Sequence, residues 1–348
     1  METAVATQRE RLPTFADELA FTKLKQAFQV LRRGNHFSFA YPDIEKMWAQ
    51  GFLRLSEFIR SAGRLRLVDP VSSMAQQVAA NRPTTLVEAM PLCRLPYQFT
   101  WIEWNPEERR ADMAQFVPNG LTVPKHEGML LLALEPTLQY FAAIPVWKHT
   151  TCEIPVTPSR VMVFDFRSEA QPTDKAIEER VCGLLDMDRQ KWGYFKGLQS
   201  DIDEVVAMAT FGLRCSTVRN PLILEALDLL ERRDSSMLAR LDRDAESDTS
   251  GDGRFIVAVL ALLHARNATE REEVRAGGGA RIRVGGPPLS PHHRVCLNLS
   301  RIAGNRVRGG TAVERRAHLV RGHFKVRKTS RTPEGVDLFW WNPHLRGS

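Results

Sequence analysis

Residues 97–104, YQFTWIEW, are rich in aromatic side chains and alternate in polarity, which is the pattern of a β-strand. Three further apolar runs follow and are separated by turns that contain proline: residues 129–134, 139–147 and 161–166. Strands at this spacing predict an antiparallel sheet that helices cover on one side.

Glu103 lies between two tryptophans near the end of the first run, and two interpretations of it are open. Its carboxyl group could be buried between Trp101 and Trp104 and have a perturbed pKa. Polar residues near strand ends more often point into solvent, so we expect Glu103 to be exposed.

Helical patterns precede and follow the strands. Apolar residues at 21, 24, 28 and 31 recur at helical spacing, and two more helices are expected to begin near Pro42 and to span residues 72–81. Asn220 and Pro221 are typical of the N-cap and first position of a helix. The middle of the chain is predicted to hold helices at residues 174–185, 201–213, 222–232 and 254–266.

An acidic stretch at residues 243–253 superficially resembles a calcium-binding loop. Aligned from Asp242, it lacks the glycine at the sixth position and the glutamate at the twelfth that such loops require. We therefore expect a solvated acidic loop.

These patterns place the chain in the α+β class, with helical N-terminal and middle segments around an antiparallel sheet and a basic C-terminal module that contains a β-hairpin. A length of 348 residues exceeds what one core usually holds. The expected divisions are a helical region at 1–90, an α+β body at 91–270, a linker rich in glycine and proline at 271–291, and the basic β-rich module at 292–348.

Positive charge is concentrated at the C-terminal end. Sixteen Lys or Arg and five Asp or Glu residues follow residue 270, whereas residues 1–270 carry 32 Lys or Arg against 36 Asp or Glu. A concentrated positive face attracts phosphate backbones or acidic protein surfaces.

The five cysteines are widely spaced and form no CxxC pair, which disfavours a disulfide framework and structural zinc. The first residues lack an apolar signal segment, and no stretch of about 18 apolar residues exists. We expect a protein of the reducing cytoplasm, without a membrane partner.

The last 31 residues repeat a short phrase, because His318-Leu319-Val320-Arg321-Gly322 is echoed by His344-Leu345-Arg346-Gly347. Between the phrases, His323, Lys325 and Arg327 alternate with Phe324 and Val326, which predicts a strand with one basic and one apolar face. Residues 336–341 alternate likewise, and the intervening Thr332-Pro333-Glu334-Gly335 predicts a hairpin. A strand at residues 295–299 could pair with this hairpin.

The hairpin carries the strongest candidate binding site. Arginine offers fork-shaped donors to phosphate or carboxylate, and tryptophan offers a flat face to a base, a proline or a cation. We expect Trp340 to pack the hairpin onto the body, and Trp341 either to pack or to contact a partner. The candidate partner-binding residues are His318, Arg321, Gly322, His323, Phe324, Lys325, Arg327, Trp341, His344 and Arg346.

Two chemical alternatives are weaker. His318, His323 and His344 could hold zinc if they converge, but no HExxH motif or carboxylate ligand accompanies them. A nuclease that uses histidine with arginine or lysine on the basic ribbon stays open. We assign no catalytic residue, no metal and no cofactor.

The C-terminal end resembles that of a family of type V-A anti-CRISPR proteins, the second in its series, and of its relatives in phages and plasmids. Members end in a His-x-x-Arg-Arg-Gly-His-Trp phrase followed by an aromatic strand with Trp-x-Pro. The matching residues are His318, Arg321, Gly322, His323 and Phe324, then Trp341-Asn342-Pro343, with Leu95-Pro96 before the central strand. Phe324 replaces the tryptophan of the phrase, and Val320 replaces its first arginine.

The resemblance implies a mobile-element protein, in the cytoplasm of a bacterial host, that recognises a polypeptide and suppresses synthesis of an RNA-guided nuclease. The implied partner is a host or defence-system polypeptide, including a nascent chain at the ribosome with nearby RNA. The alternative is a nucleic-acid-binding protein or nuclease that uses the basic C-terminal ribbon.

Overall fold

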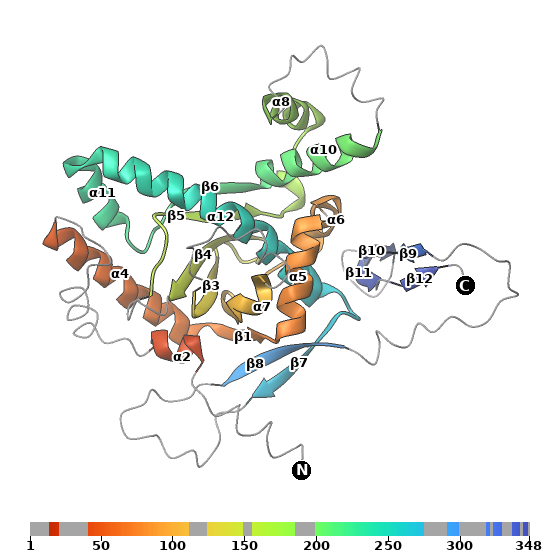
Figure 1. Ribbon diagram of the computed structural model, residues 1–348, viewed down its shortest axis with the longest axis horizontal. Helices are drawn as coiled ribbons and strands as arrows, with labels where there is room; N and C mark the ends of the chain where they lie inside the picture. Colours follow the sequence, from red (N-terminus) through yellow and green to blue (C-terminus); the bar gives the residue numbers. More distant parts are fainter. Residues whose placement is uncertain are drawn as a thin grey trace, which may run out of the picture.

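The computed structural model describes residues 14–20, 41–81, 83–110, 124–148, 155–184, 199–274, 291–298, 318–320, 323–328, 336–341 and 344–346. Within these ranges the main body is one sheet between two groups of helices (Figure 1). The predicted helix around residues 21–31 lies outside the described residues. No helix in the described ranges is long and apolar enough to cross a membrane.

The main sheet has eight strands in the order β6-β5-β4-β3-β2-β1-β8-β7. Strand β1 lies parallel to both β2 and β8, and the remaining neighbours are antiparallel. The strands are β1 Gly63–Leu67, β2 Phe99–Trp104, β3 His126–Ala133, β4 Tyr140–Lys148, β5 Arg160–Asp165, β6 Cys215–Arg219, β7 Thr269–Val274 and β8 His292–Leu297.

The expectation of an α+β fold around an antiparallel sheet is therefore wrong, because the sheet is mixed and the fold is α/β. The parallel pair β1–β2 is joined by a helical crossover through α5 (Asp69–Asn81), α6 (Pro83–Ala89) and the 3-10 turn η1 (Met90–Leu92). Strand β1 reads GRLRL, in which arginine and leucine alternate, but the run is only five residues long and the sequence analysis did not predict a strand here. Its placement between strands that are distant in sequence decides the topology.

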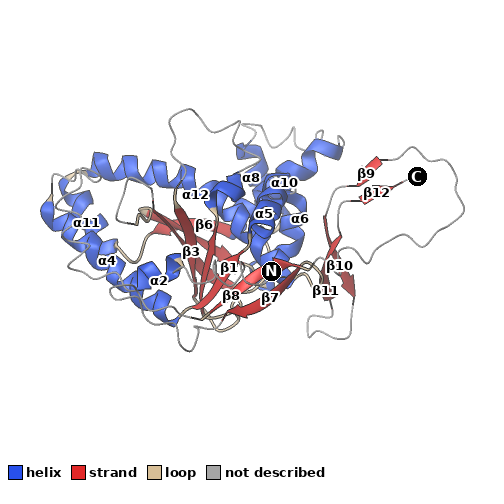
Figure 2. Ribbon diagram, turned by 60° about the horizontal axis from the view of Figure 1, so that its bottom comes forward, coloured by secondary structure: helices blue, strands red, loops and turns tan. Residues whose placement is uncertain are grey.

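Helices cover both faces of the sheet, not one as expected. Along β3, Met129 and Leu131 belong to one core cluster and Leu130 and Leu132 to the other. The first cluster includes residues of α5, α6 and α12 (Ser235–His264), and the second includes residues of α2 (Phe15–Ala20), α4 (Pro42–Ser61) and α11 (Leu224–Arg233). Strands buried on both faces read as continuous apolar runs, which explains the sequence of residues 129–132. Figure 2 shows these two groups of helices on either side of the strands.

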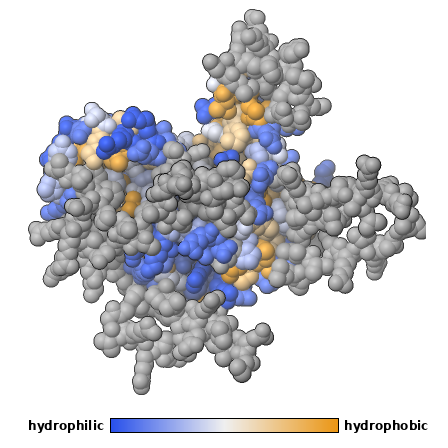
Figure 3. Space-filling model, in the orientation of Figure 1, coloured by the Kyte–Doolittle hydropathy of each residue, from blue (hydrophilic) through white to orange (hydrophobic). Residues whose placement is uncertain are grey.

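Helix α8 (Asp174–Leu184) projects from the body in Figure 1, and the next described helix, α10 (Gln199–Arg214), links it to β6. The two helices share a small core around Val181, Cys182 and Ala209. Hydrophobic residues gather at the surface of this pair in Figure 3, where Leu184 is 52% exposed and Leu213 is 41% exposed.

The acidic stretch 243–253 lies inside α12, so the expected loop is wrong. Two glycines and several acidic residues lower its helix propensity, but the stretch packs on the sheet. A Cβ at Gly253 would lie 3.0 Å from the Met162 sulfur, so this glycine permits a close approach between α12 and β5. Tertiary packing here outweighs local propensity.

Asn220 does not cap a helix as predicted, since α11 begins at Leu224. Its Oδ1 atom accepts a hydrogen bond from the Leu222 amide at 3.0 Å. Its Nδ2 atom donates to Thr157 Oγ1 and to the Pro158 carbonyl. Asn220 therefore forms a buried turn that ties the end of β6 to the segment before β5.

The C-terminal segments divide between the main sheet and two small ones. Strand β8 pairs with β1 and β7, and not with the hairpin as we expected. The expected linker 271–291 begins within β7, and residues 275–290 of it lie outside the described residues. The small sheets are β10 (His323–Lys328) with β11 (Val336–Trp341) and β9 (His318–Val320) with β12 (His344–Arg346).

Gly128 on β3 provides a test of core packing. A Cβ at this position would lie 2.3 Å from Cζ2 of Trp101, which is fully buried on β2. We expect Gly128→Ala to lower the free energy of unfolding by about 1–3 kcal/mol, because the indole must shift within a packed core. Urea denaturation measures this change.

Gly251→Ala is the matched control, because Gly251 is helical and no atom lies within 4 Å of the added Cβ. We expect it to raise the free energy of unfolding by about 0.4–1 kcal/mol. Equal effects at the two positions would contradict the packing described around Trp101.

Candidate functional site

The predicted hairpin forms, and its register is defined. Strands β10 and β11 are antiparallel, with Phe324 opposite Trp340, Lys325 opposite Phe339 and Arg327 opposite Asp337. Phe324 and Trp340 make an edge-to-face contact with ring centroids 4.9 Å apart. This cross-strand aromatic pair fixes one end of the ribbon.

One face of the hairpin is locked into the main core. Phe324, Leu338 and Trp340 are 4–5% exposed and belong to the same cluster as the buried residues of α12. The expectation that Trp340 packs the hairpin onto the body is confirmed. Val326 departs from the predicted apolar face, because it is 48% exposed.

Polar contacts from the end of α12 hold β11 from its outer edge. The Asn267 side chain accepts a hydrogen bond from the Trp340 amide at 2.8 Å and donates one to the Trp340 carbonyl at 2.7 Å. The Arg266 amide donates to the Leu338 carbonyl at 3.1 Å, and the Arg266 guanidinium lies 2.9 Å from the Asp337 carboxylate. Asp337 is 7% exposed and the Arg266 side chain is 43% exposed, so the pair joins a buried carboxylate to a guanidinium at the surface.

Beyond Phe324, strand β10 is cationic and open on both of its faces. Lys325, Val326, Arg327 and Lys328 are exposed in succession. The Arg327 guanidinium lies 4.9 Å from the centre of the Phe339 ring, which supports it by a cation–π contact. The hairpin thus presents positive charge on a backbone that the body holds in place.

The repeated phrases are brought together as backbones. His344 pairs with Val320, Leu345 with Leu319, and Arg346 with His318 in the antiparallel sheet β12–β9. Arg321 and Gly322 lie outside the described residues, and of His318, His323, Trp341, His344 and Arg346 only the backbone is described. His323 and Trp341 are register partners at the end of the hairpin.

A second polar site, centred on Glu103, has geometry that the sequence analysis missed. Glu103 is 6% exposed, so our expectation of a solvated residue is wrong. Its Oε2 atom accepts hydrogen bonds from Trp101 Nε1 and from the Ala16 amide, both at 2.9 Å. Burial raises the pKa of Glu103, while these hydrogen bonds and the nearby Arg66 oppose the rise.

Helix α2 lies over this carboxylate and closes it off. Thr14 and Asp17 cap the helix reciprocally, since the Thr14 hydroxyl accepts from the Asp17 amide and the Asp17 carboxylate accepts from the Thr14 amide. Asp17 also pairs with Arg64 of β1 at 2.8 Å, and both side chains are at most 6% exposed. The cluster therefore fixes α2 to β1 and β2.

His126 of β3 lies at the open margin of the same cluster. Its ring stacks on Phe15 with centroids 5.3 Å apart, and its Nε2 atom lies 3.9 Å from a Glu18 oxygen. Glu18 also accepts a hydrogen bond from Lys148 Nζ at 2.9 Å. Burial lowers the pKa of His126, and Lys125, Lys148 and Arg66 lower it further against the attraction of Glu18.

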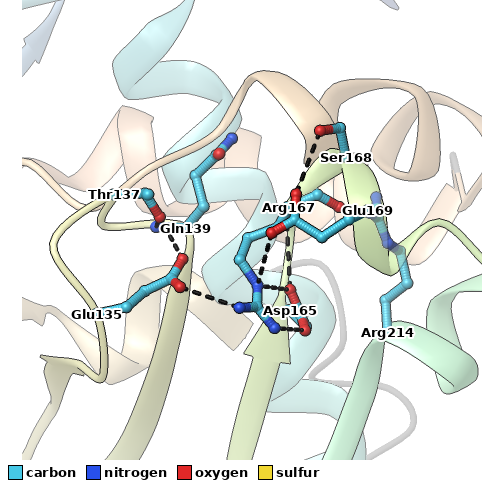
Figure 4. A network of polar contacts seen from close by, with 8 residues as sticks. All are labelled: Glu135, Thr137, Gln139, Asp165, Arg167, Ser168, Glu169 and Arg214. Atoms are coloured by element: carbon cyan, nitrogen blue, oxygen red, sulfur yellow. Dashed lines mark hydrogen bonds and ion pairs between the residues drawn. The ribbon is translucent and has the colours of Figure 1, made fainter.

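A third network lies near the end of β5 (Figure 4). The Arg167 guanidinium donates to both Asp165 oxygens and to Glu135, and it lies 4.8 Å from the Tyr140 ring centre. Arg214 donates to the Arg167 carbonyl. The hydrogen bonds and charge of Asp165 and Glu135 raise the pKa of Arg167, so these contacts keep a fixed positive charge in a structural clamp.

No group of three His, Cys, Asp or Glu side chains in the described part of the chain could hold a metal ion. Comparison of the chain with protein-family models, with curated proteins and with solved structures gives no match. The sites are therefore interpreted from their own geometry.

Asn267→Ala tests how the hairpin is held. The change removes both hydrogen bonds to Trp340 and leaves buried backbone groups without those partners. We expect a loss of about 1–3 kcal/mol in the free energy of unfolding and faster hydrogen exchange in β10 and β11 than in β3. Mass-detected hydrogen exchange measures both effects.

The matched control is Asn81→Ala, because Asn81 is exposed and its amide bonds only the Gln77 carbonyl. It should change the free energy of unfolding by less than about 0.5 kcal/mol. Unaltered hairpin protection in Asn267→Ala would show that apolar packing alone holds β11.

Glu103→Gln tests the cost of the buried carboxylate. Since the folded-state pKa is raised, the folded protein binds this proton more tightly than the unfolded chain, and stability falls as pH rises through that pKa. Glutamine stays neutral and retains an oxygen for both donors. We expect the variant to be more stable than the wild type at pH 7, with a gap that narrows toward about pH 4.

Urea denaturation at several pH values measures this difference. Glu57→Gln is the control, since Glu57 is exposed on α4. A gap that widens with falling pH would refute the assigned direction.

Proposed function

We propose that the chain is a binding protein whose hairpin β10–β11 presents a fixed cationic strand to an acidic partner. The observation that supports this most is the contrast between the anchored residues and the exposed residues of the ribbon. Phe324, Leu338 and Trp340 are buried in the core, while Lys325, Arg327 and Lys328 are exposed. A strand fixed in this way loses little conformational entropy when it binds, which favours a specific contact.

A polypeptide is the partner class that we favour. Arg327 stacked on Phe339 forms a platform that combines charge with an apolar surface, and arginine with aromatic residues is enriched in protein interfaces. The His318-x-x-Arg321-Gly322-His323 phrase and Trp341-Asn342-Pro343 resemble the corresponding residues of type V-A anti-CRISPR proteins. We accordingly propose a phage or plasmid protein that captures a defence polypeptide and suppresses synthesis of an RNA-guided nuclease.

Nucleic acid is the second candidate. Lys325, Arg327 and Lys328 follow one strand, and cationic side chains that track a backbone bind phosphates with little sequence preference. This candidate requires affinity that falls steeply with salt, because counterion release drives phosphate binding.

Charge reversal on the hairpin tests the proposal in cells. We expect Lys325→Glu/Arg327→Glu/Lys328→Glu to restore the level of a co-expressed type V-A nuclease that the wild-type protein lowers, because reversal abolishes attraction to an acidic partner. Immunoblotting and transcript quantification measure this level. Lys46→Glu/Lys175→Glu/Arg240→Glu makes the same change in charge at exposed positions elsewhere and should behave as wild type.

The partner class is resolved with purified protein. Capture of the nascent nuclease chain that survives RNase supports polypeptide recognition. Salt-sensitive retention of single-stranded RNA by the wild type, lost in the triple variant, supports the second candidate. If the triple variant captures the nascent chain and retains RNA as well as the wild type does, both the polypeptide and the nucleic-acid candidates are excluded.

A further inference from the structure

Two strands of this chain are exposed in an unusual way. Along β7, Glu270, Arg271, Glu272 and Glu273 are all exposed, and along β10 the exposed run is Lys325 to Lys328. A strand covered on one face shows alternating exposure, as β6 does at the other edge of the main sheet. Exposure of consecutive residues means that the described residues cover neither face of β7 or β10 there.

Both strands are also terminal in their sheets. Strand β7 is the last strand of the eight-stranded sheet, and β10 pairs with β11 alone among the described strands. Edge strands expose unpaired backbone donors and acceptors, and charged side chains normally keep another strand away. That protection works against a strand of the same sign and fails against one of opposite sign.

The charges of the two edges are complementary. Strand β7 reads Glu-Arg-Glu-Glu over residues 270–273, and β10 reads Lys-Val-Arg-Lys over residues 325–328. In a parallel register Glu270, Glu272 and Glu273 fall beside Lys325, Arg327 and Lys328, and Arg271 falls beside Val326. An antiparallel register gives two opposite-charge pairs and places Arg271 beside Arg327, which is unfavourable.

The two strands do not meet within one molecule. Arg266 and Asn267, which immediately precede β7, hold β11 through the Leu338 carbonyl and the Trp340 amide and carbonyl. These groups lie on the edge of β11 that faces away from β10. Strand β11 therefore separates β10 from the start of β7, and Figure 2 shows the hairpin beyond the end of the main sheet.

We propose that β10 of one molecule adds to the β7 edge of a second copy as a parallel strand. The contact joins two different surfaces, so it generates a chain or a ring of molecules and not a closed two-fold dimer. It requires no external partner and thus goes beyond the proposed function. Because it uses Lys325, Arg327 and Lys328, self-association and capture of an acidic partner compete for the same strand.

The test uses the full-length protein after nuclease treatment, measured by sedimentation velocity over a range of concentrations. We expect a sedimentation coefficient that rises with concentration at low salt, and an association constant at least about tenfold smaller at high salt, because screening weakens exposed ion pairs. A monomer at every concentration, or assembly that disappears with nuclease treatment, overturns the proposal.

Two charge-reversed proteins make the test specific. The β7 variant is Glu270→Lys/Glu272→Lys/Glu273→Lys, and the β10 variant is Lys325→Glu/Arg327→Glu/Lys328→Glu. We expect each to be monomeric alone. An equimolar mixture should assemble again with the two variants alternating, because two interfaces are then complementary: the unaltered β10 with the unaltered β7, and the reversed β10 with the reversed β7.

A chain that carries both sets of reversals should assemble again, with an association constant within about tenfold of the wild type. Glu57→Lys/Asp174→Lys/Glu179→Lys is the control for net charge and should assemble as wild type does. Near-ultraviolet circular dichroism shows whether each reversed chain is folded. If one is unfolded, glutamine replacements at the same β7 and β10 positions are used in its place. Undiminished assembly of either reversed or glutamine variant overturns the proposal.

Discussion

The architecture depends on strand β1, which is five residues long and joins two parts of the sheet that are far apart in sequence. Its parallel pairing with β2 on one side and β8 on the other connects β2–β6 to β7 and β8. Leu65 and Leu67 point into the core under α5, while Arg64 points to the opposite face and binds Asp17 of α2. One short strand therefore positions a helix on each face of the sheet.

Helix α12 transmits this arrangement to the candidate binding hairpin. Its residues 255–262 are completely buried in the main core, so the position of its C-terminal end is fixed by the sheet. That end supplies Arg266 and Asn267, which hold β11, and it leads directly into β7. The hairpin and strand β7 are thus both held by residues that directly follow α12. The buried Trp340 ring adds apolar contact to the hydrogen bonds that Asn267 and Arg266 make with β11.

The features that local pattern could predict are those set by local chemistry. The apolar runs of β2 to β5 were predicted as strands, and the alternation around Phe324 and Trp340 identified the hairpin and its buried tryptophan. The parallel placement of β1 was not predictable, because GRLRL is only five residues long and its partners lie dozens to hundreds of residues away. Residues 243–253 lie in a helix that packs on β5, and the local pattern of this stretch did not predict that contact.

Glu103 illustrates the same limit for a single side chain. Its position between two tryptophans signalled an unusual environment, but the deciding partner is the Ala16 amide of α2, 87 residues earlier in the chain. A buried carboxylate is tolerated where fixed donors replace water, and Trp101 Nε1 supplies the second donor from the same strand. The pattern Trp-x-Glu-Trp on a strand that also faces a capped helix is the signal that would have predicted burial.

The fold also divides the positive charge that the sequence concentrates after residue 270. Arg294 of β8 lies in register with Glu272 of β7 and with Arg66 of β1, which in turn lies beside Glu103, so this cation belongs to a row of charges that crosses four strands. Its guanidinium is 3.7 Å from Glu272. Lys325, Arg327 and Lys328 lie instead on the outer strand of the hairpin, exposed to solvent. The excess charge is therefore not spread evenly over the C-terminal end. One part balances the acidic edge of the main sheet, and another is displayed on a strand that Phe324 anchors in the core.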